Sequence, residues 1–378
     1  MYLDHAATTP LDPRVLEVMM PYLTDQFGNA SSPHGRGRRA RFAVEEARER
    51  IAMRIGAEPG EIVFTSGATE SNNTALALSR GKGLVTTLAE HEATLEPAKA
   101  MQEAGDTEVI LLDPGAKGFV TADEVAAVLT DRTALVSVMH VNNETGAVSP
   151  IRAIADVARR RAVLMHTDAV QSMGYLAPNV DDLGVDLLSI SSHKLYGPKG
   201  IGVLFVRAGI ELPAFVRGGA QERRRRGGTE NVASIVGMAE AVDLAYRERD
   251  DRLAHVGMLR DRLRAGLDEA LDTAYTFNTP FDEGAAPHVV NLSFPPVDGR
   301  PMDGEMLILN LDVAGIQASS GSACTSGAIE PSHVLLAMGH DRETASAALR
   351  FSLGKDTTEA EVDQAVEVVK NVVERMRG

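Results

Sequence analysis

Short runs of apolar residues alternate with longer stretches in which apolar positions recur every three or four residues, from about residue 60 to residue 206. The short runs are rich in β-branched residues and predict buried strands, while the longer stretches predict helices. Strands separated by helices imply a largely parallel sheet, because parallel neighbours need a crossover connection between them. The expected strands span residues 61–65, 83–88, 108–112, 134–139, 163–167, 187–191 and 202–206.

The pattern changes after about residue 250 and predicts a smaller α+β unit. Its expected helices span residues 252–271 and 302–311, and its expected strands span residues 289–294, 316–319 and 349–352. A chain of 378 residues is too long for one ordinary hydrophobic core, so two domains are expected.

Two helix starts carry the capping-box pattern, a Thr followed three residues later by a Glu. Thr121 with Glu124 predicts a helix that runs through residue 129, and Thr358 with Glu361 predicts the last helix of the chain. The apolar residues of that last helix fall on one face, which predicts a packed helix: Val362, Ala365, Val366, Val369, Val372, Val373 and Met376.

Composition narrows the class of protein. The 38 Lys and Arg against 53 Asp and Glu give a net charge of −15, which opposes attraction to nucleic acid or to an anionic membrane. No apolar run approaches the roughly 20 residues of a membrane-spanning helix. With one cysteine there is no internal disulfide, and the N-terminus lacks a signal-peptide pattern, so a cytoplasmic protein is expected.

The one cysteine, Cys324, lies among Ser, Gly, Ala and Thr residues at positions 319–327. This composition is typical of a surface loop, whereas an inert free cysteine usually lies in an apolar core. Because exposure is one requirement for thiol reactivity, the setting favours a reactive thiol over an inert one.

Polar residues that follow the expected strands are the candidates for chemistry, because ligands of open α/β sheets bind beyond the carboxyl ends of the strands. Residues 66–73 form a Gly turn with hydroxyls that leads into a helix, which suits a phosphate, although Ser and Thr also cap ordinary helices. Asp168 suits a protonated pyridine nitrogen or a helix cap. Lys194 suits a Schiff base or a solvated loop.

His91 and Asn143 follow two further strands. An imidazole can stack on a flat ring or lie at the surface, and an amide can bond a phenolic oxygen or a substrate carboxylate. The concurrence of these five features after successive strands indicates a site for pyridoxal 5'-phosphate, since a phosphate, a ring, its nitrogen and its aldehyde all need partners.

The chain resembles the cysteine desulfurases of the class V aminotransferase group, from residues 2–10 to residues 349–354. The most specific matches are residues 65–73, 140–146, 166–171, 192–194, 221–229 and 320–326. It looks like the iron–sulfur-assembly and nitrogen-fixation type, because Cys324 lies in a long Ser-Gly-Ser-Ala-Cys-Thr-Ser loop.

The resemblance implies aminotransferase fold type I, an α/β architecture with a mostly parallel seven-stranded sheet. The large cofactor-binding domain would span residues 13–250. The small domain would combine residues 1–12 with residues 251–378 and would carry the cysteine loop.

The resemblance also implies roles for the strand-end residues. Lys194 would hold the cofactor as a Schiff base, Asp168 would pair with its ring nitrogen, and Gln171 would bond its phenolic oxygen. His91 would stack on the ring and is a candidate catalytic residue.

A second group of residues is implied to bind phosphate and substrate. The phosphate ligands would be Ala68, Thr69, Ser191 and His193, with Thr229 reaching in from the second subunit of a homodimer. Asn143 and Arg350 would hold the substrate carboxylate, which a planar guanidinium can bind through two hydrogen bonds.

The activity implied is cysteine desulfuration, in which L-cysteine becomes L-alanine and its sulfur moves to Cys324 as a persulfide. Either His91 or the bound substrate would take the Cys324 proton. The partner would be a sulfur-acceptor protein such as an iron–sulfur scaffold, with tRNA thiolation and DNA sulfur modification as the other destinations. No resident metal is expected, although Cys324 is a candidate transient ligand of an iron–sulfur cluster.

Two other functions compete with this one. A lyase or aminotransferase for another amino acid, such as selenocysteine, would use the same cofactor without Cys324. A non-catalytic scaffold or sulfur carrier would retain only the fold. Two departures from the usual pattern are Ala220, where relatives commonly have Gly, and the basic run 223–226, interpreted here as exposed.

Overall fold

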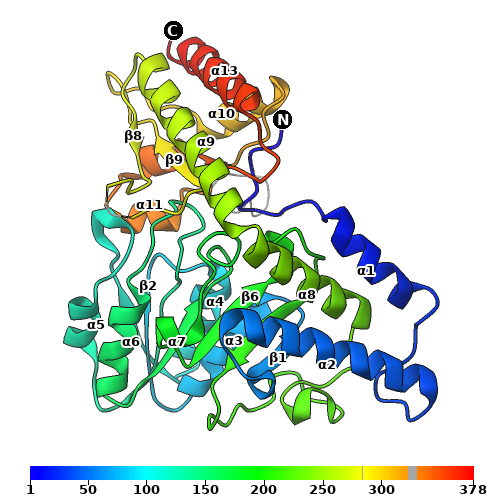
Figure 1. Cartoon of the computed structure of the whole chain (residues 1–378). Coiled ribbons are helices and arrows are strands. Elements are labelled where there is room, and N and C mark those ends of the chain that lie inside the picture. The colour runs from blue at the N-terminus through cyan, green and yellow to red at the C-terminus, as the bar shows by residue number, and fades with distance from the viewer. Residues whose placement is uncertain (283, 322–329) are drawn as a thin grey trace.

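A seven-stranded sheet forms the centre of the larger part of the molecule in a computed structural model, which describes residues 1–282, 284–321 and 330–378 (Figure 1). Its strands lie in the order β1-β7-β6-β5-β4-β2-β3, and only β7 runs antiparallel to its neighbours. The strands are β1 (Ile62–Thr65), β2 (Gly83–Thr87), β3 (Glu108–Leu112), β4 (Thr133–Ser137), β5 (Leu164–Asp168), β6 (Leu187–Ser191) and β7 (Gly202–Val206). The mostly parallel sheet predicted from the sequence is therefore confirmed.

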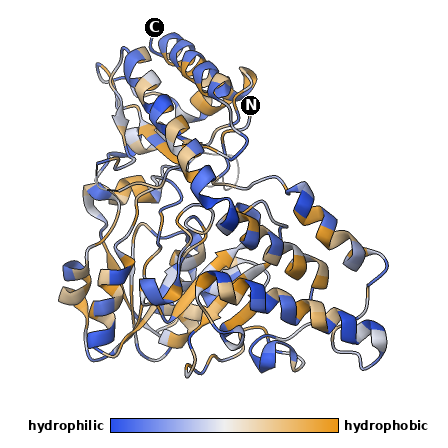
Figure 2. Ribbon diagram, viewed as in Figure 1, coloured by the Kyte–Doolittle hydropathy of each residue, from blue (hydrophilic) through white to orange (hydrophobic). Residues whose placement is uncertain are grey.

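Helices cover both faces of this sheet. Successive residues of a strand point to opposite faces of the sheet, and each face has its own hydrophobic core. Phe64 packs in the core of the first face and Val63 in the core of the second. The first face carries α1 (Pro13–Leu23), α2 (Gly35–Ile55), α5 (Ala122–Val128), α6 (Ile151–Arg160), α7 (Val180–Leu183) and α8 (Val232–Arg247). The second carries α3 (Ala68–Leu76) and α4 (Glu92–Glu103). Figure 2 shows the strands mainly in hydrophobic colours and the outer helices in mixed ones.

The second unit has its own sheet and core. Strands β8 (Thr276–Phe277), β9 (Val289–Ser293) and β10 (Ala348–Ser352) form an antiparallel sheet in the order β10-β9-β8. Its helices are α9 (Arg249–Ala270), α10 (Gly304–Val313), α11 (His333–Ala337), α12 (Arg342–Ser346) and α13 (Glu359–Arg377). Leu3 packs in the same core as the apolar face of α13. The domain boundaries given above stay a prediction.

Short 3-10 helices complete the chain: η1 (Pro59–Glu61), η2 (Ala77–Ser79), η3 (Gly115–Lys117), η4 (Ser192–Lys194) and η5 (Gln221–Arg224). Both capping boxes are formed, at Thr121 with Glu124 and at Thr358 with Glu361.

The strand expected at residues 316–319 is wrong. Gln317 forms a single bridge with Tyr2 and Ser319 a single bridge with Arg350, so the segment meets a different partner at each position and no ladder develops. The N-terminus takes part in the same way, because Asp4 bridges Ser352.

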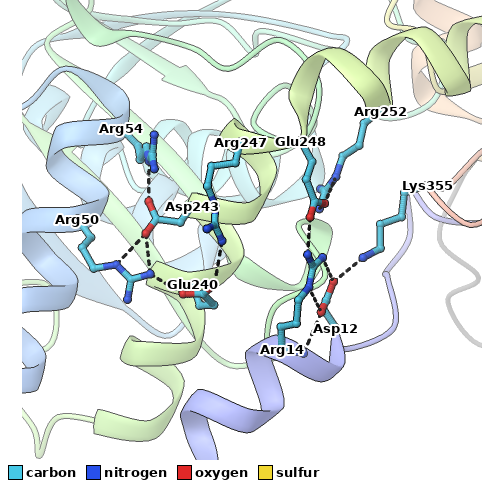
Figure 3. A network of polar contacts seen from close by, with 10 residues as sticks. All are labelled: Asp12, Arg14, Arg50, Arg54, Glu240, Asp243, Arg247, Glu248, Arg252 and Lys355. Carbon is cyan, nitrogen blue, oxygen red and sulfur yellow. Dashed lines mark hydrogen bonds and ion pairs between the residues drawn. The ribbon is translucent and has the colours of Figure 1, made fainter.

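Ion pairs connect the two units next to α1, as Figure 3 shows. Asp12 accepts hydrogen bonds from Arg14 and Lys355, and Arg14 also contacts Glu248 at 2.5 Å. Glu248 in turn accepts from Arg252 at 2.8 Å. Because Lys355 follows β10 and Arg14 lies on α1, this cluster fixes the first helix against the end of the small sheet.

Candidate active site

A cavity of about 670 Å³ lies at the carboxyl ends of the parallel strands. Ten of the residues proposed from the sequence line it: Ala68, Thr69, His91, Asn143, Asp168, Gln171, Ser191, His193, Lys194 and Arg350. Asp168 is the last residue of β5 and Ser191 the last of β6, while Ala68 begins α3 three positions after the last residue of β1. The residues from Ala68 to Lys194 thus converge because parallel strands end at one edge of the sheet. Arg350 joins them from the small sheet.

Lys194 lies in η4, directly after β6. Its Nζ donates to the carbonyl oxygens of Ala6 and Ala7. Burial, together with the nearby charge of Arg350, lowers the pKa of Lys194 to about 8. A larger fraction of this amine is therefore neutral near neutral pH than for an exposed lysine, as a nucleophilic amine requires.

Asp168 is held in a fixed orientation by two donors. Its Oδ2 accepts from Asn72 Nδ2 at 2.7 Å, and its Oδ1 accepts from the Val170 N–H at 2.9 Å. Gln171 donates from Nε2 to the Ala6 carbonyl at 2.9 Å and accepts from His288 Nε2 at 3.3 Å. Both side chains are buried yet line the cavity.

The start of α3 lines the cavity and has the features of an anion-binding turn. Gly67 has φ +155°, and a Cβ placed there would find no atom within 4 Å, so the turn is open. The adjoining first turn of α3 presents N–H groups that no helical carbonyl uses. His193 Nδ1 contacts Thr8 Oγ1 at 3.1 Å, and burial followed by the charges of Lys194 and Lys199 lowers the pKa of His193 to about 4.

His91 is the N-cap of α4 and accepts the Ala93 N–H on Nδ1 at 3.0 Å. Because a neutral imidazole that accepts on Nδ1 carries its proton on Nε2, this bond fixes both the tautomer and the place of the ring at the cavity wall.

Arg350 reaches the cavity from the small sheet, where it lies in β10. Its Nη1 donates to the Asn143 carbonyl at 2.8 Å and its Nη2 to Asp4 Oδ1 at 2.6 Å. Within the described part of the chain, Arg350 Nε and Asn143 Oδ1 are buried without a hydrogen-bond partner. The Arg350 Nε donor suits a ligand carboxylate, whereas the Asn143 Oδ1 acceptor suits a ligand N–H or O–H group.

Two proposed residues are not placed in this cavity. Thr229 is exposed and does not line it, and Cys324 lies outside the described residues. Ser319 and Gly321, which precede Cys324 in the chain, do line it.

The sequence reasoning missed several lining groups. Ala6, Ala7 and Thr8 form one wall, and Lys199 lies at the edge. Their types carry no chemical signal, and only their position in the matched N-terminal and strand-end segments could have indicated them.

The basic run at residues 223–226 is only partly exposed, which corrects its interpretation as a solvated run. Arg223 and Arg224 are exposed, whereas Arg225 and Arg226 are half-buried. Arg225 donates to the carbonyl of Gly60 at 2.9 Å, and Arg226 pairs with Glu70 at 3.0 Å. Two of the four guanidiniums therefore fasten this loop to the segments on either side of β1.

Neither a metal nor a membrane site is evident within the described ranges. No group of three His, Cys, Asp or Glu side chains there is arranged to hold a metal ion. No described helix is both long and apolar enough to cross a membrane.

A family model described as aminotransferase class-V matches residues 1–365. The chain belongs to this family. The class V chain is 44% identical over 383 residues to the cysteine desulfurase IscS of Dictyoglomus turgidum, covering 100% of this chain and 95% of that protein. It is 46% identical over 386 residues to the cysteine desulfurase IscS of Anaeromyxobacter dehalogenans, covering 100% and 93%.

A solved structure described as a NifS-like protein superposes on this class V chain with a TM-score of 0.90 at 35% identity. The match covers 99% of both chains. The family, the fold and the resemblance to cysteine desulfurases over the full length are therefore established.

Proposed function

We propose that this chain is a pyridoxal-phosphate-dependent cysteine desulfurase, which converts L-cysteine to L-alanine and transfers the sulfur to Cys324 as a persulfide. The observation that carries the proposal is the convergence on one cavity of ten residues predicted to bind cofactor or substrate, with Lys194 half-buried among them. The full-length identity to curated cysteine desulfurases supports the same activity.

The cavity residues fit the cofactor. The open turn at Gly67 and the start of α3 suit its phosphate, and Asp168 is a buried carboxylate that suits a pyridinium. Lys194 would hold the aldehyde carbon, with Gln171 at the phenolic oxygen and His91 against the ring. Ala68, Thr69, Ser191 and His193 would surround the phosphate.

Pyridoxal phosphate, when bound, supplies an electron sink that stabilises negative charge at the substrate α-carbon. Asp168 keeps the ring nitrogen protonated, which that role requires. Arg350 and Asn143 bind the substrate carboxylate and so orient the α-carbon toward Lys194. Lys194, with its lowered pKa, removes the α-proton and later returns a proton to the product.

The sulfur transfer is a displacement at the substrate sulfur. The Cys324 thiolate forms a new S–S bond while the bond between the substrate sulfur and its β-carbon breaks, and the bonding electrons stay with the β-carbon. Protonation of that carbon gives alanine. Before the attack, the Cys324 proton passes to the bound substrate, or to His91 once its Nδ1 has released the Ala93 N–H.

We extend the proposal to the assembly and its partners. The protein acts as a cytoplasmic homodimer in which Thr229 reaches the phosphate of the other subunit. The persulfide then passes to an acceptor protein such as an iron–sulfur scaffold, with the cluster or thiolated product as cargo. The division into residues 13–250 and residues 1–12 with 251–378 places the cysteine loop and Arg350 on the small domain.

A Cys324→Ala variant tests the persulfide role. We expect it to keep the yellow colour of bound cofactor but to form neither alanine nor sulfide from cysteine, measured by amino-acid analysis and sulfide release. Undiminished turnover would assign the activity to a lyase that does not need Cys324. A wild-type protein that stays colourless after addition of pyridoxal phosphate would instead indicate a non-catalytic relative.

A further inference from the structure

A chain of buried polar side chains lies behind the cavity wall that Asp168 forms. Asn72, on α3, is fully buried. Its Nδ2 donates to Asp168 Oδ2 at 2.7 Å and to Thr94 Oγ1 at 3.3 Å. Thr94, on α4, is also fully buried. One amide therefore connects the carboxylate with a second helix.

Glu90 lies in the same region and is fully buried. Its Oε1 accepts the Met139 N–H at 2.6 Å, and its Oε2 has no hydrogen-bond partner among the described residues. Burial raises the pKa of Glu90 well above its ordinary value, the charge of Asp168 adds to this, and the Thr94 hydroxyl opposes it. Burial therefore disfavours the charged form of Glu90.

These side chains come from the elements that bear the proposed cofactor ligands. Asn72 lies one turn after Thr69 on α3, Thr94 one turn after His91 on α4, and Asp168 ends β5. A contact among the three therefore fixes the phosphate cradle, the stacking ring and the pyridine partner relative to one another.

We propose that Asn72 is a positioning residue for the cofactor: its amide holds one oxygen of Asp168 so that the carboxylate faces the ring nitrogen, and Thr94 holds the amide. The inference rests on the proposed function, because it assumes pyridoxal phosphate in the cavity.

The physical reason is that a buried carboxylate without enough donors rotates or takes up a proton. Asn72 supplies the donor to Oδ2, whereas the Val170 N–H serves Oδ1. A hydrogen bond to a charged group contributes about 1.5–3 kcal/mol. Loss of the Asn72 donor therefore weakens the pairing with the ring nitrogen even though every residue that touches the cofactor remains.

The test uses Asn72→Leu, which keeps the branched shape of the side chain and removes both hydrogen bonds. We expect the dissociation constant for pyridoxal phosphate, measured by titration of the cofactor-free protein, to rise about tenfold or more. The pH midpoint of the bound cofactor's visible absorption should shift as well, because the charge facing the ring nitrogen changes.

Three further variants separate the effect of the Asn72 contacts from a general loss of stability. Thr94→Val is nearly isosteric and removes only the contact that holds the amide, so we expect a smaller shift of the same midpoint. Glu90→Gln keeps the side-chain shape and leaves both hydrogen bonds of Asn72 in place, so both quantities should stay within about twofold of wild type. Asn278→Leu removes a similarly buried amide in the small sheet and should lower stability in urea without moving the midpoint.

Unchanged affinity and absorption in both Asn72→Leu and Thr94→Val would overturn the inference, as would an equal shift in Asn278→Leu. If Asn72→Leu does not fold, Thr94→Val alone decides the outcome. A wild-type protein that binds no pyridoxal phosphate would refute the proposed function instead, so the two failures are distinguishable.

Discussion

Lys194 shows how the surroundings of one side chain prepare it for chemistry. The residue is buried beside Arg350, and two backbone carbonyls, from Ala6 and Ala7, accept its hydrogen bonds. The carbonyls orient the amine, while burial and the neighbouring positive charge favour its neutral form. A lysine on the surface would have neither property.

The pKa of Lys194 predicts how loading with cofactor depends on pH. Only the neutral amine attacks the aldehyde, so the loading rate of the cofactor-free protein should rise about tenfold per pH unit until pH about 8 and then level off. Stopped-flow absorbance gives this rate. A midpoint near 10.5, the ordinary lysine value, would contradict the buried setting.

The position of Arg350 in the cavity predicts how its replacement affects the affinity for substrate. Its replacement by Lys keeps a positive charge but loses the planar pair of donors, so KM for cysteine should rise about tenfold to a hundredfold while the cofactor colour persists. Steady-state alanine formation measures KM. Arg342→Lys, an exposed change, is the control. An unchanged KM in Arg350→Lys would remove Arg350 from the substrate site.

Sequence reasoning found the residues at strand ends because each carries a recognisable chemical type at a predictable place. Asp168 and Lys194 are of this kind. Asn72 was not singled out, since it lies inside a helix and its partner is 96 positions away. The Ala6 and Ala7 carbonyls were missed for a different reason. They are backbone groups, and a backbone group has no residue type to mark it.

At the scale of elements, the loop around η5 is strained and held by a buried ion pair. Glu222, Arg223 and Arg224 have φ of 45°, 56° and 68°, a region that costs non-glycine residues about 1 kcal/mol or more each. The Glu222 carboxylate accepts from Arg48 at 2.7 and 2.9 Å and from the Phe64 N–H at 2.9 Å. These bonds attach the loop to α2 and β1 and offset the strain.

Glu222→Gln should therefore destabilise the protein strongly. The change breaks the buried pair with Arg48, which typically costs about 3–5 kcal/mol of the free energy of unfolding. The partly exposed Glu45, 3.3 Å from Arg48 Nε, then offsets part of this loss. Urea unfolding measures it. The matched control is Asp363→Asn, which breaks the exposed pair with Arg262 and should cost less than about 1 kcal/mol. Equal losses in the two variants would show that Glu222 does not hold the loop.

Most elements could be predicted from periodicity and caps, because these signals are local. The strand at residues 316–319 was predicted wrongly and β8 was missed, because short edge segments depend on partners far along the chain. The basic run was misread for a similar reason. The partners that bury half of it, Gly60 and Glu70, belong to another segment.

At the scale of the whole molecule, the proposed homodimer would share each active site between its two subunits. Thr229 is exposed here and lies three positions after Arg226, which pairs with Glu70 on α3. The loop that would serve the partner's phosphate is thus tied to this subunit's own phosphate cradle.

Mixing two inactive variants tests the shared site. A dimer of one Lys194→Ala and one Thr229→Ala subunit contains one site with both wild-type residues if Thr229 acts across the interface. Since about half of randomly mixed dimers are of this kind, we expect about a quarter of wild-type alanine formation after subunit exchange. Activity no greater than the average of the separate variants would place Thr229 in its own subunit's site or outside any site.

The bridges made by the first residues mean that one wall of the cavity forms late during synthesis. Leu3 donates to the Gln317 carbonyl at 2.9 Å, and Ala6 donates to Ser352 Oγ at 2.8 Å. The wall that Ala6 and Ala7 give to the cavity therefore cannot be in place until residue 352 has left the ribosome. At about 5–20 residues per second, the N-terminal segment waits for roughly half a minute. Residues made early are therefore among the last to take their places, and the cavity is complete only after residue 352 has been made.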